Sequence, residues 1–200
     1  MTQTHMMDDR FFNEIVVRDE VSKLRALLQA VPKWEEVAVA EADAFAASDH
    51  GEMSAEQQHW HDEFINDRYF SIDVTKEALF RGLAVSAAST VENVMGMLCQ
   101  EYNVALRERA NWVDKRRGLE QLIGGTSLGD IPGFDSADRA RILANCFKHN
   151  GGTVNQTYIA AIAIRPLGEE IRYQDENWGA ILDGIQTALL ALVQRLPARP

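Results

Sequence analysis

The residues best placed to do chemistry lie in one short run, Arg141-Ile-Leu-Ala-Asn145-Cys-Phe-Lys148-His149. If this run is helical, Asn145 and His149 are four residues apart and share one face. Arg141 and Lys148 are seven residues apart and also share a face, two turns apart. An imidazole can take up or release a proton near neutral pH. The run therefore predicts a polar helix face that combines an amide, an imidazole and two cations.

The same run also carries the signals of a helix C-terminus. Basic side chains such as Lys148 favour the last turn of a helix, and Asn150-Gly151-Gly152 is a common stop signal. A capping role accounts for Lys148 and for the glycines. It does not account for the pairing of Asn145 with His149.

Glu92 lies in the most apolar helical segment of the chain, SAASTVENVMGMLC. A carboxylate among small apolar side chains costs free energy unless it is hydrogen-bonded or paired. Two interpretations are open. Glu92 is half-exposed on an outer strip with Thr90 and Asn93, or it is an internal acceptor that holds an Asn, Arg or His of a neighbouring helix.

Other patterns that could support chemistry are weaker. The sequence has no phosphate-binding loop, dinucleotide-binding glycine motif, CxxC, HExxH or GxSxG, so no cofactor and no metal site is predicted. His59 and His61 point about 200° apart on a helix and cannot share one metal ion. Cys99 and Cys146 are predicted to be buried, reduced thiols. A catalytic pair of Cys146 with His149 is disfavoured, because no neighbouring charge lowers the thiol pKa.

The elements that must position these residues are helices almost throughout the chain. Apolar spacing and capping residues predict a first helix from Asp8 or Asp9 to about Val31, ended by Pro32. An acidic helix follows from about Lys33. Ser54 and Gln57 form a capping box for a further segment, and whether 33–70 is one bent helix or two stays open. A helix break is expected at 72–75.

The central helix is expected at about 76–102, where the small-residue run GLAVSAAST allows a neighbouring backbone to approach closely. Later helices are expected at Trp112–Ile123, closed by Gly124-Gly125, then at 137–149 with Asp135 or Ser136 as the cap, and at about 175–196. Residues 153–174 allow either a short β-hairpin near 160–174 or a helix that ends before Pro166. The predicted fold is an all-α bundle of five to seven helices in a single domain, 1–200.

Composition and charge narrow the function classes. The 200 residues are 46% hydrophobic and 25% charged, which suits a globular core that needs no disulfides. The first residues lack the pattern of a signal peptide, and no apolar run reaches the ~20 residues of a membrane helix, so a cytoplasmic protein with no membrane partner is expected. The net charge of −10 argues against indiscriminate nucleic-acid binding. Residues 105–148 nevertheless carry eight basic and six acidic side chains, a net charge of +2.

The run NCFKHNGG at 145–152 resembles the end of the signature helix of HEPN-type proteins, an all-α superfamily rich in prokaryotic toxins and defence ribonucleases. That signature is an Arg followed about four to six residues later by His. The segment SAASTVENVMGMLCQEY at 86–102 resembles the Ser-x-x-Glu helix of the same fold. The resemblance covers about 76–196 as a HEPN-like helical core, and residues 1–75 are N-terminal helices of unassigned role. It implies a homodimer in which Arg and His of two protomers line a cleft and cut RNA without a metal.

The chain departs from this signature at Ala144, which stands where the family has its catalytic Arg. The nearest Arg upstream is Arg141, one turn earlier. In a mechanism of this kind, His149 moves a proton and Arg141 or Lys148 stabilises the charge that develops on the phosphate. Asn145 and Glu92 would orient these groups.

Two functions are consistent with this pattern. The first is a non-catalytic or weakened relative of metal-independent ribonucleases that acts in toxin, defence or RNA-linked regulatory systems, with RNA or a protein as partner. The second is an active metal-independent endoribonuclease, in which Ala144→Arg is expected to raise activity.

Overall fold

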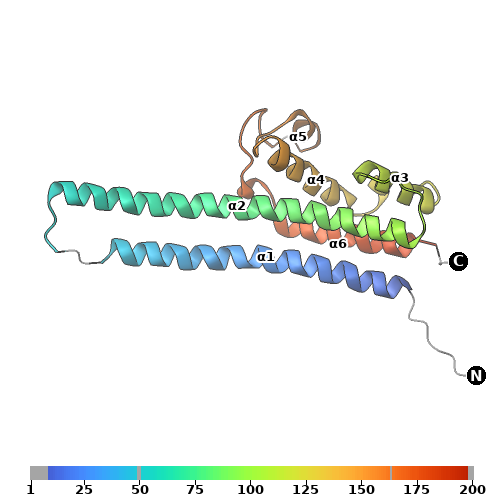
Figure 1. Cartoon of the computed structure of the whole chain (residues 1–200), viewed down its shortest axis with the longest axis horizontal. Helices are drawn as coiled ribbons and strands as arrows, with labels where there is room; N and C mark the ends of the chain where they lie inside the picture. The colour runs from blue at the N-terminus through green and yellow to red at the C-terminus, as the bar shows by residue number, and fades with distance from the viewer. Residues whose placement is uncertain (1–8, 49–50, 163, 198–200) are drawn as a thin grey trace, which may run out of the picture.

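Two long antiparallel helices dominate the computed structural model, which describes residues 9–48, 51–162 and 164–197 (Figure 1). Over that part of the chain the protein is all-α, without a strand, which confirms the predicted bundle of five to seven helices. The helices are α1 (Asp9–Ala46), α2 (Ala55–Glu101), α3 (Trp112–Leu122), α4 (Phe134–His149), α5 (Gln156–Ala161) and α6 (Trp178–Arg195). Short 3-10 turns lie at Leu128–Asp130 and Tyr173–Asp175.

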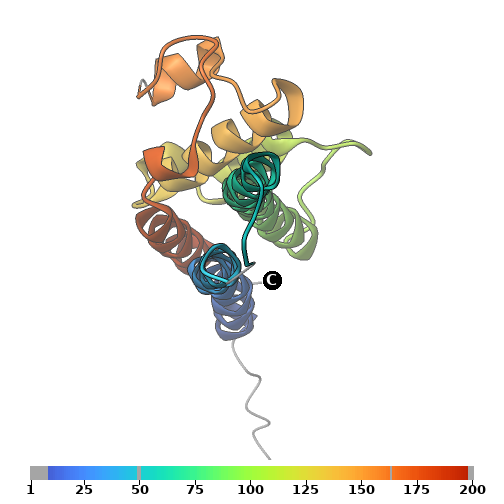
Figure 2. The same cartoon turned by 90° about the vertical axis from the view of Figure 1, so that its left-hand side faces the viewer.

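Four of the helices form the bundle that contains the core. α1 packs on α2, α2 on α4, α4 on α6 and α6 on α1, so the contacts close into a ring, which the end-on view displays (Figure 2). α4 and α6 cover only one end of the α1–α2 pair, and the other end extends beyond them (Figure 1). The molecule is therefore a four-helix bundle with a projecting two-helix hairpin.

The centre of the bundle is the second half of α2, as the small-residue run predicts. Leu83, Ala84, Ala87 and Val91 have no exposed surface, and the alanines leave room for the neighbouring helices to approach. By length and composition alone, an 18-residue stretch of α2 could cross a membrane, but 56% of that stretch is buried inside the protein. Burial of this kind is typical of the core helix of a bundle.

The predicted helix ends at Pro32 and at 72–75 are wrong. α1 continues through Pro32, and α2 runs without interruption from Ala55 to Glu101. Proline removes one backbone hydrogen bond, but Val31 and Ala42 are both buried, and their spacing of 11 residues places both on one face of a continuous helix. Ile72 is likewise buried within α2. Residues 33–70 are thus parts of two helices joined by a loop, and the boundary at 75–76 falls inside α2.

Two of the helix ends predicted from capping residues agree with the structure, unlike the helix breaks predicted at Pro32 and at 72–75. Ser54 and Gln57 form the predicted capping box, and the Ser54 side chain accepts a hydrogen bond from the Gln57 N–H. α3 ends before Gly124 and Gly125, which both have positive φ. Asp8, the alternative cap of the first helix, lies outside the described residues.

The β-hairpin considered for 160–174 does not form. Asn155 caps α5 by accepting from the Tyr158 N–H, and this turns the chain into a short helix. The later segment instead pairs with residues before α5, through one isolated bridge between Thr153 and Glu170. A few backbone hydrogen bonds join the two segments, among them one from the Val154 N–H to the Glu169 carbonyl at 2.8 Å.

α4 begins earlier than predicted, and neither Asp135 nor Ser136 is its cap. The preceding residue is Gly133, in the left-handed conformation with φ of 84°, and the first helical residue is the buried Phe134. Burial of the Phe134 ring, which lies 6.3 Å from the Trp112 ring, favours the earlier start.

Candidate functional site

Three of the predicted residues line one face of α4. Arg141, Asn145 and His149 border a shallow cavity of about 280 Å³ between the end of α4 and the start of α5. The rest of its wall consists of Ile142, Asn150, Asn155 and Thr157. The spacing argument therefore placed Asn145 and His149 together correctly, on a surface that is polar and open to solvent.

Lys148 and His149 are exposed at the last turn of α4, and Asn145 is half-buried one turn earlier. Helix α4 ends at Asn150, whose N–H bonds the carbonyl of Cys146. The C-terminal signals that the sequence carries are therefore used as such, while the imidazole of His149 stays accessible beside them.

Ala144 lies on a different side of α4. Its exposed fraction is 2%, so this position faces the interior of the bundle. An arginine here would have to place its guanidinium in the core, where an uncompensated charge is costly. A cation at position 144 would therefore not reach the cavity that Asn145 and His149 border.

Arg141 is engaged by other groups. Its guanidinium carbon lies 5.5 Å from the centroid of the Trp112 ring, and its Nε lies 3.6 Å from Oδ1 of Asp138. Both contacts are to the start of α3 and the preceding turn of α4. The guanidinium thus joins α4 to α3, although the side chain also borders the cavity.

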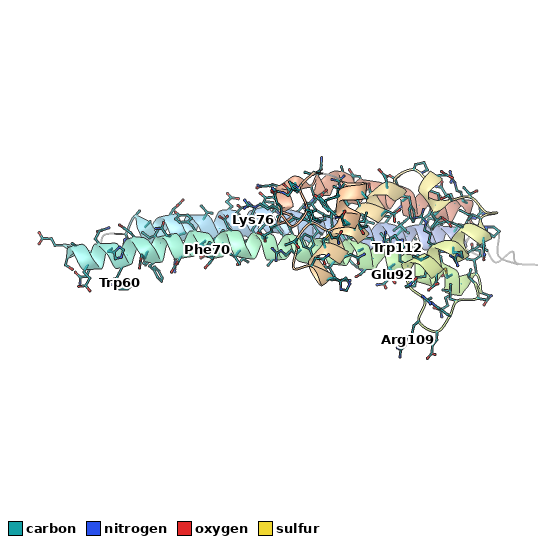
Figure 3. All side chains as sticks on the ribbon, turned by 90° about the horizontal axis from the view of Figure 1, so that it is seen from above. Trp60, Phe70, Lys76, Glu92, Arg109 and Trp112 are labelled. Carbon is teal, nitrogen blue, oxygen red and sulfur yellow. The ribbon has the colours of Figure 1, made fainter. Side chains whose placement is uncertain are left out.

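The basic tract at 105–148 is largely neutralised by ion pairs. Arg116 binds both Glu120 and Asp138 at 3.0 Å, and Arg107 binds Asp114 at 2.6 Å. Further pairs in the tract are Lys115 with Glu92 and Arg139 with Glu176. Arg109 lies in the 103–111 loop, which projects away from the bundle (Figure 3). A continuous positive surface for a phosphate backbone is therefore absent from the tract.

Glu92 does not take part in the α4 cavity. Its Oε1 accepts from Lys115 Nζ at 3.0 Å, and its side chain is 39% exposed. Glu92 is therefore partly exposed, as the first interpretation has it, and its partner on the neighbouring helix is a lysine rather than the Asn, Arg or His of the second. That cation belongs to α3, and none of the residues that border the α4 cavity is its partner.

A buried ion pair beside α4 was not predicted from the sequence. Arg139 donates from Nε to Glu176 Oε2 at 2.6 Å, and the Glu176 side chain has no exposed surface. Burial raises the pKa of Glu176, and the hydrogen bond from Arg139 opposes this rise. Tyr158, also fully buried, has a pKa raised to about 12, chiefly by burial. Arg139 and Glu176 border a cavity of about 590 Å³ between α4 and the start of α6.

No sequence signal distinguishes this pair. Arg139 and Glu176 are 37 residues apart and come from α4 and from the turn before α6. Only the packing of these two elements brings the charges together. Arg139 binds one oxygen of the carboxylate, Oε2, while the buried Oε1 has no hydrogen-bond partner among the described residues.

The remaining candidates have structural roles. Cys99 and Cys146 are free and fully buried, and burial raises the pKa of both thiols. His61 stacks on Phe45 with 5.6 Å between ring centroids, while His59 lies 3.5 Å from Glu63. Among the described residues, no three His, Cys, Asp or Glu side chains are grouped so that they could hold a metal ion.

Comparison with known proteins adds no assignment to this geometry. No protein-family model, curated protein or solved structure matches the chain at a significant level.

Proposed function

We propose that the chain is a HEPN-like homodimeric interaction protein, a non-catalytic relative of metal-independent ribonucleases, that acts through the α4 face bearing Asn145 and His149. One observation carries the proposal: the guanidinium of Arg141 lies over the Trp112 ring, 5.5 Å from its centroid, and forms an ion pair with Asp138 at 3.6 Å. The cation that a phosphate-cleaving site needs beside its histidine is thus engaged elsewhere.

The energetic argument concerns the transition state. Cleavage of a phosphodiester places developing negative charge on the phosphate oxygens, and pre-positioned cations supply much of the stabilisation. Ala144 carries no charge, and its buried position would not present a cation to the cavity. Lys148 is exposed and offers a point charge without the two-pronged geometry of arginine. His149 alone would retain proton transfer but lack most of the electrostatic stabilisation.

A second candidate function is a weak endoribonuclease that uses His149 with Lys148. The observation in its favour is that both side chains are exposed at the end of α4, beside an open polar cavity. A general acid or base is typically worth about 10²–10⁴ in rate. This function therefore requires that His149→Ala abolish any cleavage.

The first experiment measures cleavage of a mixed RNA pool in chelator by the wild type, His149→Ala and Lys148→Ala. The proposal expects no cleavage by the wild type above the level of His149→Ala. Wild-type cleavage that disappears in both variants would overturn the proposal in favour of the ribonuclease. The earlier expectation that Ala144→Arg raises activity loses its basis, since this change is expected to unfold the protein instead.

The second experiment tests the dimer by light scattering across protein concentrations. In a two-fold dimer formed by the α4 face, Asn145→Arg brings two like charges together and should weaken association by about tenfold or more at low salt. Gln121→Arg adds the same charge at an exposed position of α3 and serves as the matched control. A wild type that stays monomeric at high micromolar concentration would contradict the proposal.

A further inference from the structure

The projecting end of the α1–α2 pair, residues 33–46 of α1 and 55–75 of α2, is here named the distal hairpin. It is poor in buried side chains: Ala42 and Ile72 are its buried apolar residues among those described. Large apolar side chains on it are exposed instead, namely Val37 (59%), Trp60 (62%), Phe64 (48%), Phe70 (69%) and Val74 (51%). Trp60 and Phe70 lie on the part of α2 that extends beyond the bundle (Figure 3). The two helices of the distal hairpin do not bury these apolar side chains against each other, and exposed apolar patches often mark interaction sites.

A groove lies between the two helices of the distal hairpin. It has a volume of about 330 Å³, and Ala38, Ala42 and Ile72 are its apolar lining. Phe64 borders the same groove and contacts Phe45 with 5.1 Å between ring centroids. Trp60 is four residues before Phe64 and so lies on the same side of α2, one turn further toward the tip. The groove and the two aromatic rings form one continuous apolar strip.

Carboxylates surround this strip. Glu41 of α1 and Asp67 of α2 border the groove, and its one cation, Arg68, lies over the rings of Phe45 and Phe64 at 4.8 and 5.2 Å. The distal hairpin contains nine Asp or Glu against Lys33 and Arg68, a net charge of −7, whereas the whole chain carries −10. Most of the net negative charge of the protein is therefore concentrated on the element that exposes Trp60, Phe64 and Phe70.

This charge selects among possible occupants. A second copy of the hairpin would bring −7 against −7 around a common apolar contact, and like charges across an interface cost free energy. Nucleic acid and an anionic lipid surface are repelled for the same reason. A polypeptide with apolar residues at helical spacing and flanking Lys or Arg satisfies both features of the surface.

We propose that the distal hairpin is a docking surface for a basic amphipathic helix of another protein. In this arrangement an apolar side chain of the partner enters the groove beside Phe64, and its cations pair with Glu41 and Asp67. The surface is separate from the α4 face, so this proposal does not depend on the proposed function.

The experiment titrates the full-length protein against a fluorescein-labelled helical peptide of about 18 residues, with leucines on one face and lysines elsewhere, by fluorescence anisotropy at about 0.15 M salt. A matched peptide with Glu in place of Lys tests the charge. We expect the lysine peptide to bind and the glutamate peptide not to bind. Binding of both peptides, or of neither, would overturn the proposal.

Variants locate the contact. Phe64→Ser should weaken binding by about tenfold and Asp67→Asn by about threefold, because one removes an apolar anchor and the other a flanking charge. Val37→Ser and Glu36→Gln make the same kinds of change at exposed positions of α1 that do not border the groove, and each should change affinity by less than about twofold. Equal effects of the two sets would mean nonspecific attraction and would overturn the proposal.

Other occupants give distinct results. If Phe64→Ser converts a dimer to a monomer in light scattering, a second copy covers the groove and the proposal is wrong. If the wild type, but not Phe64→Ser, cosediments with vesicles of phosphatidylglycerol, the surface binds lipid and the proposal is again wrong.

Discussion

The guanidinium of Arg141 lies over the indole of Trp112, with 5.5 Å between Cζ and the ring centroid. This contact links α4 to the first residue of α3. Arg141 is also the arginine nearest to His149 in the sequence, and its guanidinium interacts with the Trp112 ring and with Asp138. The contact of Arg141 with Trp112 stabilises the packing of α4 on α3, whereas the sequence pattern indicates a catalytic role for Arg141.

Replacing Arg141 by Ala should therefore lower the free energy of unfolding by about 1 kcal/mol, the size of a cation–π contact with a partly exposed ion pair. Lys148→Ala, at an exposed position on the same helix, should change it by less than about 0.5 kcal/mol. Urea denaturation of the three proteins measures both. Equal values for the two variants would show that the Trp112 contact contributes nothing.

The buried pair of Arg139 and Glu176 predicts a pH-dependent stability. Arg139→Met leaves the buried carboxylate unpaired and should cost about 2–3 kcal/mol near pH 8. Burial raises the pKa of Glu176 in the folded state, so the folded protein binds its proton more tightly than the unfolded chain does. Stability from this group is therefore lost as pH rises from the ordinary Glu pKa to the raised one.

Loss of Arg139 removes the hydrogen bond that opposes the rise, so the variant should recover part of its deficit near pH 5. Urea denaturation at both pH values, with the double variant Arg139→Met/Glu176→Gln as control, measures this. A deficit that stays constant with pH would contradict the assignment.

The surroundings of Gly133 predict that the single methyl group added by Gly133→Ala strongly lowers the free energy of unfolding. It has φ of 84°, and a Cβ at this position would overlap the backbone carbonyl of Gly184 in α6. Gly133→Ala should therefore cost well over 2 kcal/mol. Gly168 has the same φ and open space around it, so Gly168→Ala should show only the strain of a left-handed alanine, about 1 kcal/mol. Thermal melts of both variants separate the steric contribution from the conformational one.

The two cysteines should be inert in the native protein. Both thiols are buried, and burial raises both pKa values, which lowers the thiolate fraction. A chromogenic disulfide reagent at neutral pH should detect two thiols in guanidinium chloride and almost none without it. Rapid reaction of Cys146 in the native state would revive the Cys146–His149 pair.

Several features of this protein could be predicted from sequence because they depend on residues close together in the chain. The Ser54–Gln57 capping box, the stop after α3 at Gly124 and the shared face of Asn145 and His149 follow from helix geometry alone. The all-α class follows from apolar spacing in the same way.

Tertiary packing decided what local signals could not. The missing hydrogen bond at Pro32 predicts a helix end, but Val31 and Ala42, on either side of it, are buried on one face and α1 continues. Arg141 contacts Trp112, 29 positions earlier in the chain, and no sequence signal near either residue predicts this contact. A helix break is a balance between a local cost and distant burial, and the role of a cation depends on which charges and rings surround it. Both quantities exist only once the helices are packed.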